Sequence, residues 1–199
     1  MNSVVVALAA YLIGSVSFAV VVSRAFSLPD PRSYGSGNPG ATNVLRTGRK
    51  AAAILTLLGD ATKGWLAVYL AHRYGNEPVS AAAIASVGVV LGHIFPVFHR
   101  FTGGKGVSTA AGALFALSVW LGSAVLATWI VIAAFFRISS LAAIVAAISA
   151  PVFTVILFNL RHPYLVGVAA LAVILVVRHK NNIAKLLAGT EGRIGERAS

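Results

Sequence analysis

Cysteine is absent from this sequence, and acidic residues are few. The 199 residues include 5 Asp+Glu against 16 Lys+Arg, and no cysteine. Without cysteine there can be no disulfide, no thiolate ligand for a metal and no cysteine nucleophile. Charged residues make up 11% of the chain, whereas a soluble domain carries roughly a quarter. Because 58% of the residues are hydrophobic, the composition predicts an integral membrane protein.

Several motifs of known chemistry are also missing. No group of His, Asp and Glu has the spacing of metal ligands, so we predict no metal and no other cofactor. Neither a Ser-His-Asp arrangement nor a His-x4-Asp box can be recognised. The formal net charge of +11 is spread over short loops and is not gathered in one domain, which argues against a nucleic-acid partner. Basic loops of this kind are typical of the cytoplasmic side of membrane proteins.

Long apolar runs, separated by short polar segments, make up most of the chain. They cover residues 3–22, 51–71, 79–98, 107–136, 141–160 and 164–177. The first run lacks a basic segment before it and a convincing cleavage site, so we interpret it as a retained helix and not a signal peptide. As one helix, the run 107–136 would be roughly 45 Å long, beyond a ~30 Å hydrocarbon core. We therefore expect two short helices there, turning near residues 120–123, and no strands anywhere.

The distribution of Lys and Arg predicts the topology. With seven helices and the N-terminus outside, nearly all basic residues lie on the cytoplasmic side, and the outer connections keep only Arg73 and Arg161. With six helices, Arg137 and the basic tail would lie outside, against the usual bias. We therefore predict an all-α bundle of seven transmembrane helices, two of them short, with a cytoplasmic C-terminus. It forms a single domain, 1–199, with cytoplasmic segments at 24–50, 99–106, 137–140 and 178–199.

Two glycine-rich segments stand out from the apolar background. Residues 35–43 read Gly-Ser-Gly-Asn-Pro-Gly-Ala-Thr-Asn and are followed by Arg46. We expect this segment to form neither helix nor strand, because its glycines favour turns whose N–H groups can bind an anion. Residues 103–106, Gly-Gly-Lys-Gly, combine such a backbone with one ammonium group, although the same string is also found in plain turns. It is not a Walker A loop, and Arg46 alone would also suit an interfacial arginine.

Three further polar features lie in or beside the apolar runs. His179 and Asn182 are three residues apart and would share one helix face, either at a site or at an ordinary polar helix end. Asp60 and Lys63 have the same spacing inside a predicted span, where unpaired charges are costly. We predict a structural ion pair for them, with direct substrate contact as the alternative. For His93 we favour a packing or kink role over ligand binding.

The predicted cytoplasmic face is rich in cations and neutral hydrogen-bonding groups but poor in carboxylates. This balance suits the binding of a doubly charged phosphate. Apart from His179 the face offers little conventional base, so any reaction there would need a donor that is already activated. A transporter or binder of phosphorylated metabolites would use the same cations without chemistry, and is kept as the alternative. The chemically plain outer connections and the absence of an obvious inverted repeat disfavour it.

Three ordered motifs carry a resemblance to a known family. They are Gly-Ser-Gly-Asn-Pro-Gly-Ala-Thr-Asn-Val-x-Arg at 35–46, Gly-His-x-Phe-Pro-x-Phe with Gly-Gly-Lys-Gly-Val at 92–107, and Arg-His-x-x-Asn-Ile with Leu-x-x-Gly-x-Glu at 178–191. Together they resemble the bacterial acyl-phosphate:glycerol-3-phosphate acyltransferases, the PlsY family, over essentially the whole chain. The resemblance implies seven helices in the bacterial inner membrane and a site that faces the cytoplasm. It also implies acyl transfer from lipid-embedded acyl phosphate to glycerol 3-phosphate, without a metal, by a protein that we expect to act as a monomer among membrane lipids.

The resemblance also implies roles for individual residues. Five would be catalytic: Ser36, Arg46, Lys105, His179 and Asn182. Substrate binding is predicted for Gly35, Gly37, Asn38, Gly40, Thr42, Asn43, Gly103, Gly104, Gly106 and Ser140. Thr102, Asn181 and Lys185 depart from the commoner family pattern, the first by removing a positive charge beside the glycine loop. We hypothesise that the donor's own phosphate accepts the proton of the attacking hydroxyl, with His179 as the competing acceptor.

Overall fold

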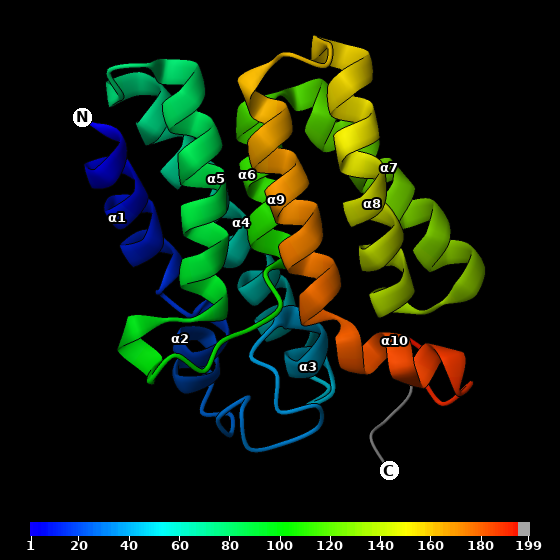
Figure 1. The fold of residues 1–199 in the computed structure, drawn as a ribbon. Coiled ribbons are helices and arrows are strands. Elements are labelled where there is room, and N and C mark those ends of the chain that lie inside the picture. Colours follow the sequence, from blue (N-terminus) through cyan, green and yellow to red (C-terminus); the bar gives the residue numbers. More distant parts are fainter. Residues whose placement is uncertain (195–199) are drawn as a thin grey trace.

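A computed structural model describes residues 1–194, and this part of the chain is helical with no strand (Figure 1). The final residues of the predicted tail, 195–199, lie outside the described part. The elements are α1 (Ser3–Gly14), α2 (Phe18–Ala25), α3 (Ala41–Leu45), α4 (Lys50–Tyr74), α5 (Pro78–Ile94), the 3₁₀ turn η1 (Val97–His99), α6 (Val107–Leu117), α7 (Val119–Phe136), α8 (Ser139–Phe158), α9 (Pro163–Arg178) and α10 (Lys180–Leu187).

Five segments are long and apolar enough to cross a membrane. They are Ser3–Ala25, Lys50–Tyr74, Pro78–His99, Val119–Phe136 and Ser139–Phe158. Helices α9 and α10 pass the same test together, with a 58° bend between them, and give a sixth. Helix α6 is apolar but shorter, with 11 residues. The described part of the chain is therefore an all-α membrane bundle with five or six candidate spans.

The first span is broken, which the sequence analysis did not predict. Helix α1 ends at Gly14 and α2 begins at Phe18. At the break the hydroxyl of Ser15 donates to the Tyr11 carbonyl over 2.9 Å, while the carbonyl of Val16 accepts a bond from the Lys63 ammonium over 2.6 Å. A carbonyl released from the helical ladder thus satisfies a charge buried in the bundle.

The run 107–136 divides into two helices as predicted, but the predicted position of the turn was wrong. The break lies at Ser118, before 120–123, so α6 is short while α7 has 18 residues. Ser118 has extended backbone angles, and its hydroxyl oxygen accepts the N–H of Leu121 over 3.4 Å. A serine that caps the N-terminus of the second helix explains where the chain turns.

The expectation that residues 35–43 contain no helix was wrong at their end. Helix α3 covers Ala41–Leu45 and places Asn43 and Val44 in the interior. The segment before it does lack regular structure, and Gly35 and Gly37 have φ angles of +59° and +64°, in the left-handed region. Glycine adopts this region without the steric cost that a side chain adds, so the turn predicted from the glycines is present.

The connections gather at the two ends of the bundle. In Figure 1, α2, α3, the segment from η1 to α6, and α10 all lie at one end, while the N-terminus lies at the other. Between the ends, helices pack closely through small residues: a Cβ on Gly64 would collide with the backbone of Thr109, and one on Gly112 with that of Ala61. Close approach of this kind is typical of helix packing in membranes. At the end of the bundle opposite the N-terminus, three segments distant in sequence therefore meet: α2 with α3, the chain from η1 to α6, and α10.

Candidate active site

A cavity of about 840 Å³ opens where these connections meet. Its polar end is bordered by the α2–α4 segment, the loop before α6, the start of α8, and the chain around α10. The five predicted catalytic residues all lie on its wall: Ser36, Arg46, Lys105, His179 and Asn182. Of the predicted substrate-binding residues, the wall includes Asn38, Gly40, Thr42, Asn43, Gly106 and Ser140. Gly35, Gly37, Gly103 and Gly104 are not part of the wall; the first two are exposed and the last two are buried.

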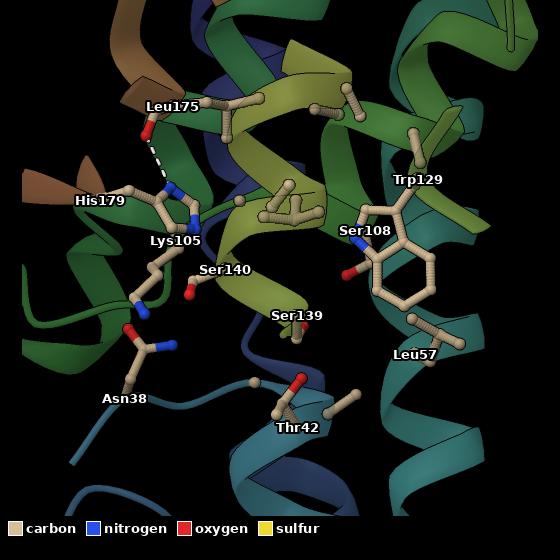
Figure 2. A pocket seen from close by; sticks show the side chains of 18 of the residues that line it. Asn38, Thr42, Leu57, Lys105, Ser108, Trp129, Ser139, Ser140, Leu175 and His179 are labelled. Carbon is tan, nitrogen blue, oxygen red and sulfur yellow. Dashed lines mark hydrogen bonds between the residues drawn. The ribbon is translucent and has the colours of Figure 1, made fainter. Parts of the chain in front are cut away.

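An apolar arm continues from the polar end between α6, α7, α8 and α9. Its wall includes Leu114, Val125, Leu126, Trp129, Ala143, Ala146, Ala147, Ala150, Val168, Leu171, Ala172 and Leu175. The α8 contribution consists of alanines one helical turn apart, so this side of the arm carries little side-chain bulk. Figure 2 shows Trp129 and Leu57 on one side and Lys105, His179 and Asn38 on the other. One continuous space thus offers polar partners at one end and hydrocarbon surface at the other.

Asn43 holds the first glycine-rich segment together. Its amide nitrogen donates to the carbonyls of Pro31 and Tyr34 over 2.7 and 3.1 Å. Its amide oxygen accepts the N–H of Ser36 over 3.0 Å and lies 3.5 Å from an Arg46 guanidinium nitrogen. A Cβ on Gly35 would collide with the same oxygen. Although Asn43 borders the cavity, its hydrogen-bonding capacity is spent on the loop.

His179 lies at the bend between α9 and α10 and is buried, with 2% of its surface exposed. Its Nδ1 donates to the Leu175 carbonyl over 2.7 Å (Figure 2). In the neutral ring this bond leaves Nε2 without a proton, so Nε2 can accept a hydrogen bond. Burial lowers the pKa of His179 below its usual value, and the charge of Lys105 adds to this effect. The residue is therefore a neutral acceptor and not a cation at neutral pH.

Lys105 supplies a cation from the second glycine-rich segment. It is half-buried, and burial lowers the pKa of its ammonium, although the nearby Glu191 carboxylate opposes this shift. In Figure 2 its side chain lies beside His179 and Asn38. The segment is fixed from outside by Arg178, whose guanidinium donates to the Gly104 carbonyl over 3.1 Å. Arg178 therefore connects the end of α9 to the loop that carries Lys105.

Glu191 is a wall residue to which the sequence analysis gave no role. Its Oε1 accepts a bond from the Ser140 hydroxyl and a second from the Asn182 amide, each over 2.6 Å. Farther along, the N–H of Ile194 donates to the Arg137 carbonyl over 2.7 Å. The chain after α10 therefore folds back against the start of α8. Glu191 is the last residue of the third motif, which was a signal in the sequence. The motif does not show which groups Glu191 bonds.

The predicted ion pair between Asp60 and Lys63 is confirmed, with 2.8 Å between Oδ1 and Nζ. Both side chains are buried, and Asp60 borders the cavity. Within residues 1–194, no group of three or more His, Asp or Glu side chains is placed to hold a metal ion. The polar end offers cations, hydroxyls and amides, together with the carboxylates of Asp60 and Glu191.

The chain is similar to known proteins over nearly its full length. A family model described as "Glycerol-3-phosphate acyltransferase" matches residues 4–189. The proteins of that name from Ralstonia nicotianae and Cupriavidus pinatubonensis are 65% and 60% identical to it. The first alignment covers 98% of this chain and 95% of the relative, and the second covers 99% and 98%.

Solved structures agree with these matches. The crystal structure of PlsY, an integral membrane glycerol 3-phosphate acyltransferase, in its glycerol 3-phosphate form has a TM-score of 0.90 and 35% identity, covering 97% of this chain and 96% of that one. The lysophosphatidic acid form has a TM-score of 0.89 and 34% identity, with coverage of 97% and 95%. The chain therefore belongs to the glycerol-3-phosphate acyltransferase family.

Proposed function

We propose that this protein transfers a fatty acyl group from acyl phosphate to the 1-hydroxyl of sn-glycerol 3-phosphate, giving lysophosphatidic acid and phosphate. The observation that supports this most directly is the continuity of the cavity, whose cationic end joins an apolar arm. Glycerol 3-phosphate suits the polar end alone, whereas acyl phosphate has a head for that end and a chain for the arm. Because the donor is a mixed anhydride with a good leaving group, no protein nucleophile is needed.

Arg46 and Lys105 are proposed to bind the phosphate of glycerol 3-phosphate from opposite segments of the wall. Ser36 and Asn182 would orient the substrate through a hydroxyl and an amide. The remaining wall residues predicted from the motifs would complete the shell: Asn38, Gly40, Thr42, Gly106 and Ser140. Two charges on one phosphate give strong, oriented hydrogen bonds, which place the 1-hydroxyl next to the acyl carbonyl.

The proposed chemistry is a direct acyl transfer. The hydroxyl oxygen attacks the carbonyl carbon, the bond from that carbon to the phosphate oxygen breaks, and the departing phosphate takes the proton. Neutral His179 supports this scheme by accepting a hydrogen bond from the hydroxyl at Nε2 and aligning it. His179 remains the competing proton acceptor. The pH dependence of activity in the unaltered protein and in His179→Gln separates alignment of the hydroxyl from acceptance of its proton.

Backbone N–H groups are proposed to stabilise the negative charge that develops on the carbonyl oxygen. Two candidates are already engaged: the N–H of Ser36 donates to Asn43, and that of Gly104 donates to the His93 carbonyl. We therefore assign this role to N–H groups of wall residues such as Gly40 and Gly106, which border the cavity. One such donor contributes about 3–4 kcal/mol to transition-state stabilisation in other acyl-transfer enzymes.

The finer topology is part of the same proposal. Seven passes, with the N-terminus outside and the site facing the cytoplasm, account for both the short helix α6 and the basic residues at the site end. The placement of the N-terminus and α10 at opposite ends of the bundle supports an odd number of passes (Figure 1). We propose one domain that acts as a monomer in the bacterial inner membrane.

The test is a reaction of the purified protein with acyl phosphate and glycerol 3-phosphate. Lysophosphatidic acid and inorganic phosphate should appear in equal amounts. The Lys105→Ala variant should form both products more slowly than the unaltered protein. Acyl-CoA in place of acyl phosphate should give no product. Binding of glycerol 3-phosphate without product, or its uptake into proteoliposomes, would instead support the binder or transporter alternative.

A further inference from the structure

A buried cluster next to the cavity has no role in the proposed reaction. The Lys63 ammonium lies 2.6 Å from the Val16 carbonyl, 2.8 Å from Oδ1 of Asp60 and 3.0 Å from Nδ1 of His93. The ammonium donates hydrogen bonds to the Val16 carbonyl and to His93, and its charge pairs with the Asp60 carboxylate. Because an ammonium can only donate, we assign Nδ1 of His93 as the acceptor and the ring proton to Nε2; the Thr109 hydroxyl, 3.2 Å from Nδ1, can donate to the same nitrogen. The cluster therefore fixes both the orientation and the tautomer of His93.

His93 in turn packs against the glycine pair that precedes Lys105. Its carbonyl accepts the N–H of Gly104 over 3.2 Å. A Cβ on Gly103 would collide with that carbonyl, and a Cβ on Gly104 would collide with Nε2 of the His93 ring. Both glycines are buried behind the cavity wall. Close packing against His93 and its neighbours therefore leaves no room for a side chain at either glycine.

The same pair is held from its other side by Arg178. Its guanidinium donates to the Gly104 carbonyl, and it also lies over the ring of Phe95, 5.8 Å from the centroid. The glycine pair is thus clamped between the end of α5 and the end of α9. The next residue is Lys105, whose ammonium depends on this clamp for its place in the cavity. A cation on a glycine-rich loop needs such a support, because the loop itself fixes little.

We propose that Asp60, Lys63 and His93 are positioning residues for the glycerol 3-phosphate site. The ion pair orients the His93 ring, and His93 holds the glycine pair that presents Lys105. A buried ion pair contributes little net stability compared with a well-packed apolar pair, so its consequence here is orientation. This inference rests on the proposed function, since it names the support of the same site.

The first experiment replaces the ion pair as a unit, with Asp60→Asn combined with Lys63→Met, so that no lone charge is left buried. We expect the KM for glycerol 3-phosphate to rise about tenfold, because small displacements of a binding group cost up to about 100-fold. The KM for acyl phosphate should stay within about twofold, since the apolar arm is untouched. Ser86→Ala is the matched control, because this buried α5 hydroxyl bonds only its own helix, to the Ala83 carbonyl.

The second experiment separates the His93 contact from ligand approach. Gly104→Ala should raise the KM for glycerol 3-phosphate, because the new Cβ meets the His93 ring. His93→Asn removes the atom at the Nε2 position. The rise in KM for glycerol 3-phosphate in the double variant should therefore be at least about threefold smaller than the product of the rises in the two single variants. The Cβ also approaches the Pro39 carbonyl, at 2.8 Å, so rescue is expected to be partial. Multiplicative effects would show that Gly104 is needed for another reason and would overturn the proposal.

Calorimetry on the same detergent-solubilised proteins measures the binding of glycerol 3-phosphate directly. This measurement distinguishes failure of the positioning role from failure of the proposed acyl transfer. Weaker binding in the charge-pair variant, with unchanged thermal unfolding, supports the positioning role even if no turnover is found in any protein. Unchanged binding and unchanged KM overturn it. Equal rises in the KM of both substrates would place Asp60 or His93 at the reacting atoms and would also overturn it. Lack of turnover in the unaltered protein would count against the proposed function alone.

Discussion

The two glycine-rich segments of the site are fixed in different ways. The first is held locally, because Asn43, at its end, bonds Ser36 within the segment and Pro31 and Tyr34 just before it. The second is held from outside, by His93 of α5 and by Arg178 of α9. Each presents one cation to the cavity, Arg46 or Lys105. Two segments of similar composition are therefore held in place differently: the first by local hydrogen bonds, the second by the packing of the bundle.

Removal of the cations should give the largest effect and separate the two segments. Lys105→Ala should lower kcat/KM by about 100-fold or more, since loss of a charged partner in a partly buried pair costs about 2–5 kcal/mol. Arg46→Ala should cost less, because the Arg46 side chain is exposed and its interaction is screened by water and salt. Rates measured at low and high salt test this: the contribution of Arg46 should shrink at high salt more than that of Lys105. Equal costs and equal salt dependence would contradict the distinction.

Loss of the internal support should damage the first segment alone. Asn43→Ala leaves the N–H of Ser36 and two loop carbonyls without their partner, at about 1–3 kcal/mol for each group that stays buried. We expect faster trypsin cleavage at Arg32, together with about tenfold lower activity, while thermal unfolding of the bundle changes little. Asn38→Ala is the control for cleavage, because it lies on the same segment without organising it. If cleavage at Arg32 is unchanged, the segment is not held by Asn43.

The pH profile should sharpen the role of His179. Burial lowers the pKa of His179 below 6.5, the ordinary value for histidine. The ring therefore stays neutral as the pH falls to 6.5 and is protonated only at lower pH. The His179 contribution to kcat/KM should therefore be constant above pH 6.5 and be lost below it. The His179→Gln profile provides the control, since phosphate itself titrates near pH 6. If His179→Gln keeps binding but loses turnover together with the inflection below pH 6.5, then His179 is the proton acceptor and the donor's phosphate is not.

The smallest effect is expected at Glu191, which borders the cavity but belongs to neither glycine-rich segment. Glu191→Gln retains an oxygen for the bonds from Ser140 and Asn182, so activity should stay within about threefold of the unaltered protein. Glu191→Ala removes the acceptor and should cost about tenfold, as expected when two bonds of about 0.7 kcal/mol each are lost. Steady-state rates of the two variants measure this difference. Similar losses in both would show that the charge itself matters.

Local chemistry made part of the fold predictable. The apolar runs identified the helical bundle, and the spacing of Asp60 and Lys63 correctly predicted an ion pair. The glycines predicted the turns of the first segment, which depend on backbone sterics that each residue carries with it. The chain breaks at Ser15 and Ser118 were missed or misplaced. Both interrupt apolar sequence where nothing local forbids a continuous helix, and packing with other helices decides the outcome.

The partners within the site were harder to foresee. The motifs named residues that the structure brings to one cavity wall, yet their individual roles remain predictions. The bond from Ser140 to Glu191 joins residues 51 positions apart, and the packing of His93 on Gly104 depends on how α5 meets the loop. Sequence favoured a packing role for His93 but could not show what it packs against. Such contacts depend on tertiary geometry, which no local pattern encodes.

The fold-back of the chain after α10 also bears on synthesis of the protein. Asn182, Glu191 and Ile194 complete the wall that begins at Arg137 and Ser140. These residues follow the helices in chain order, so the helices can enter the membrane while one side of the cavity is still missing. The cavity wall is therefore complete only after the residues that follow α10 have been added. Nascent chains stalled before Glu191 should be inserted in the membrane but inactive.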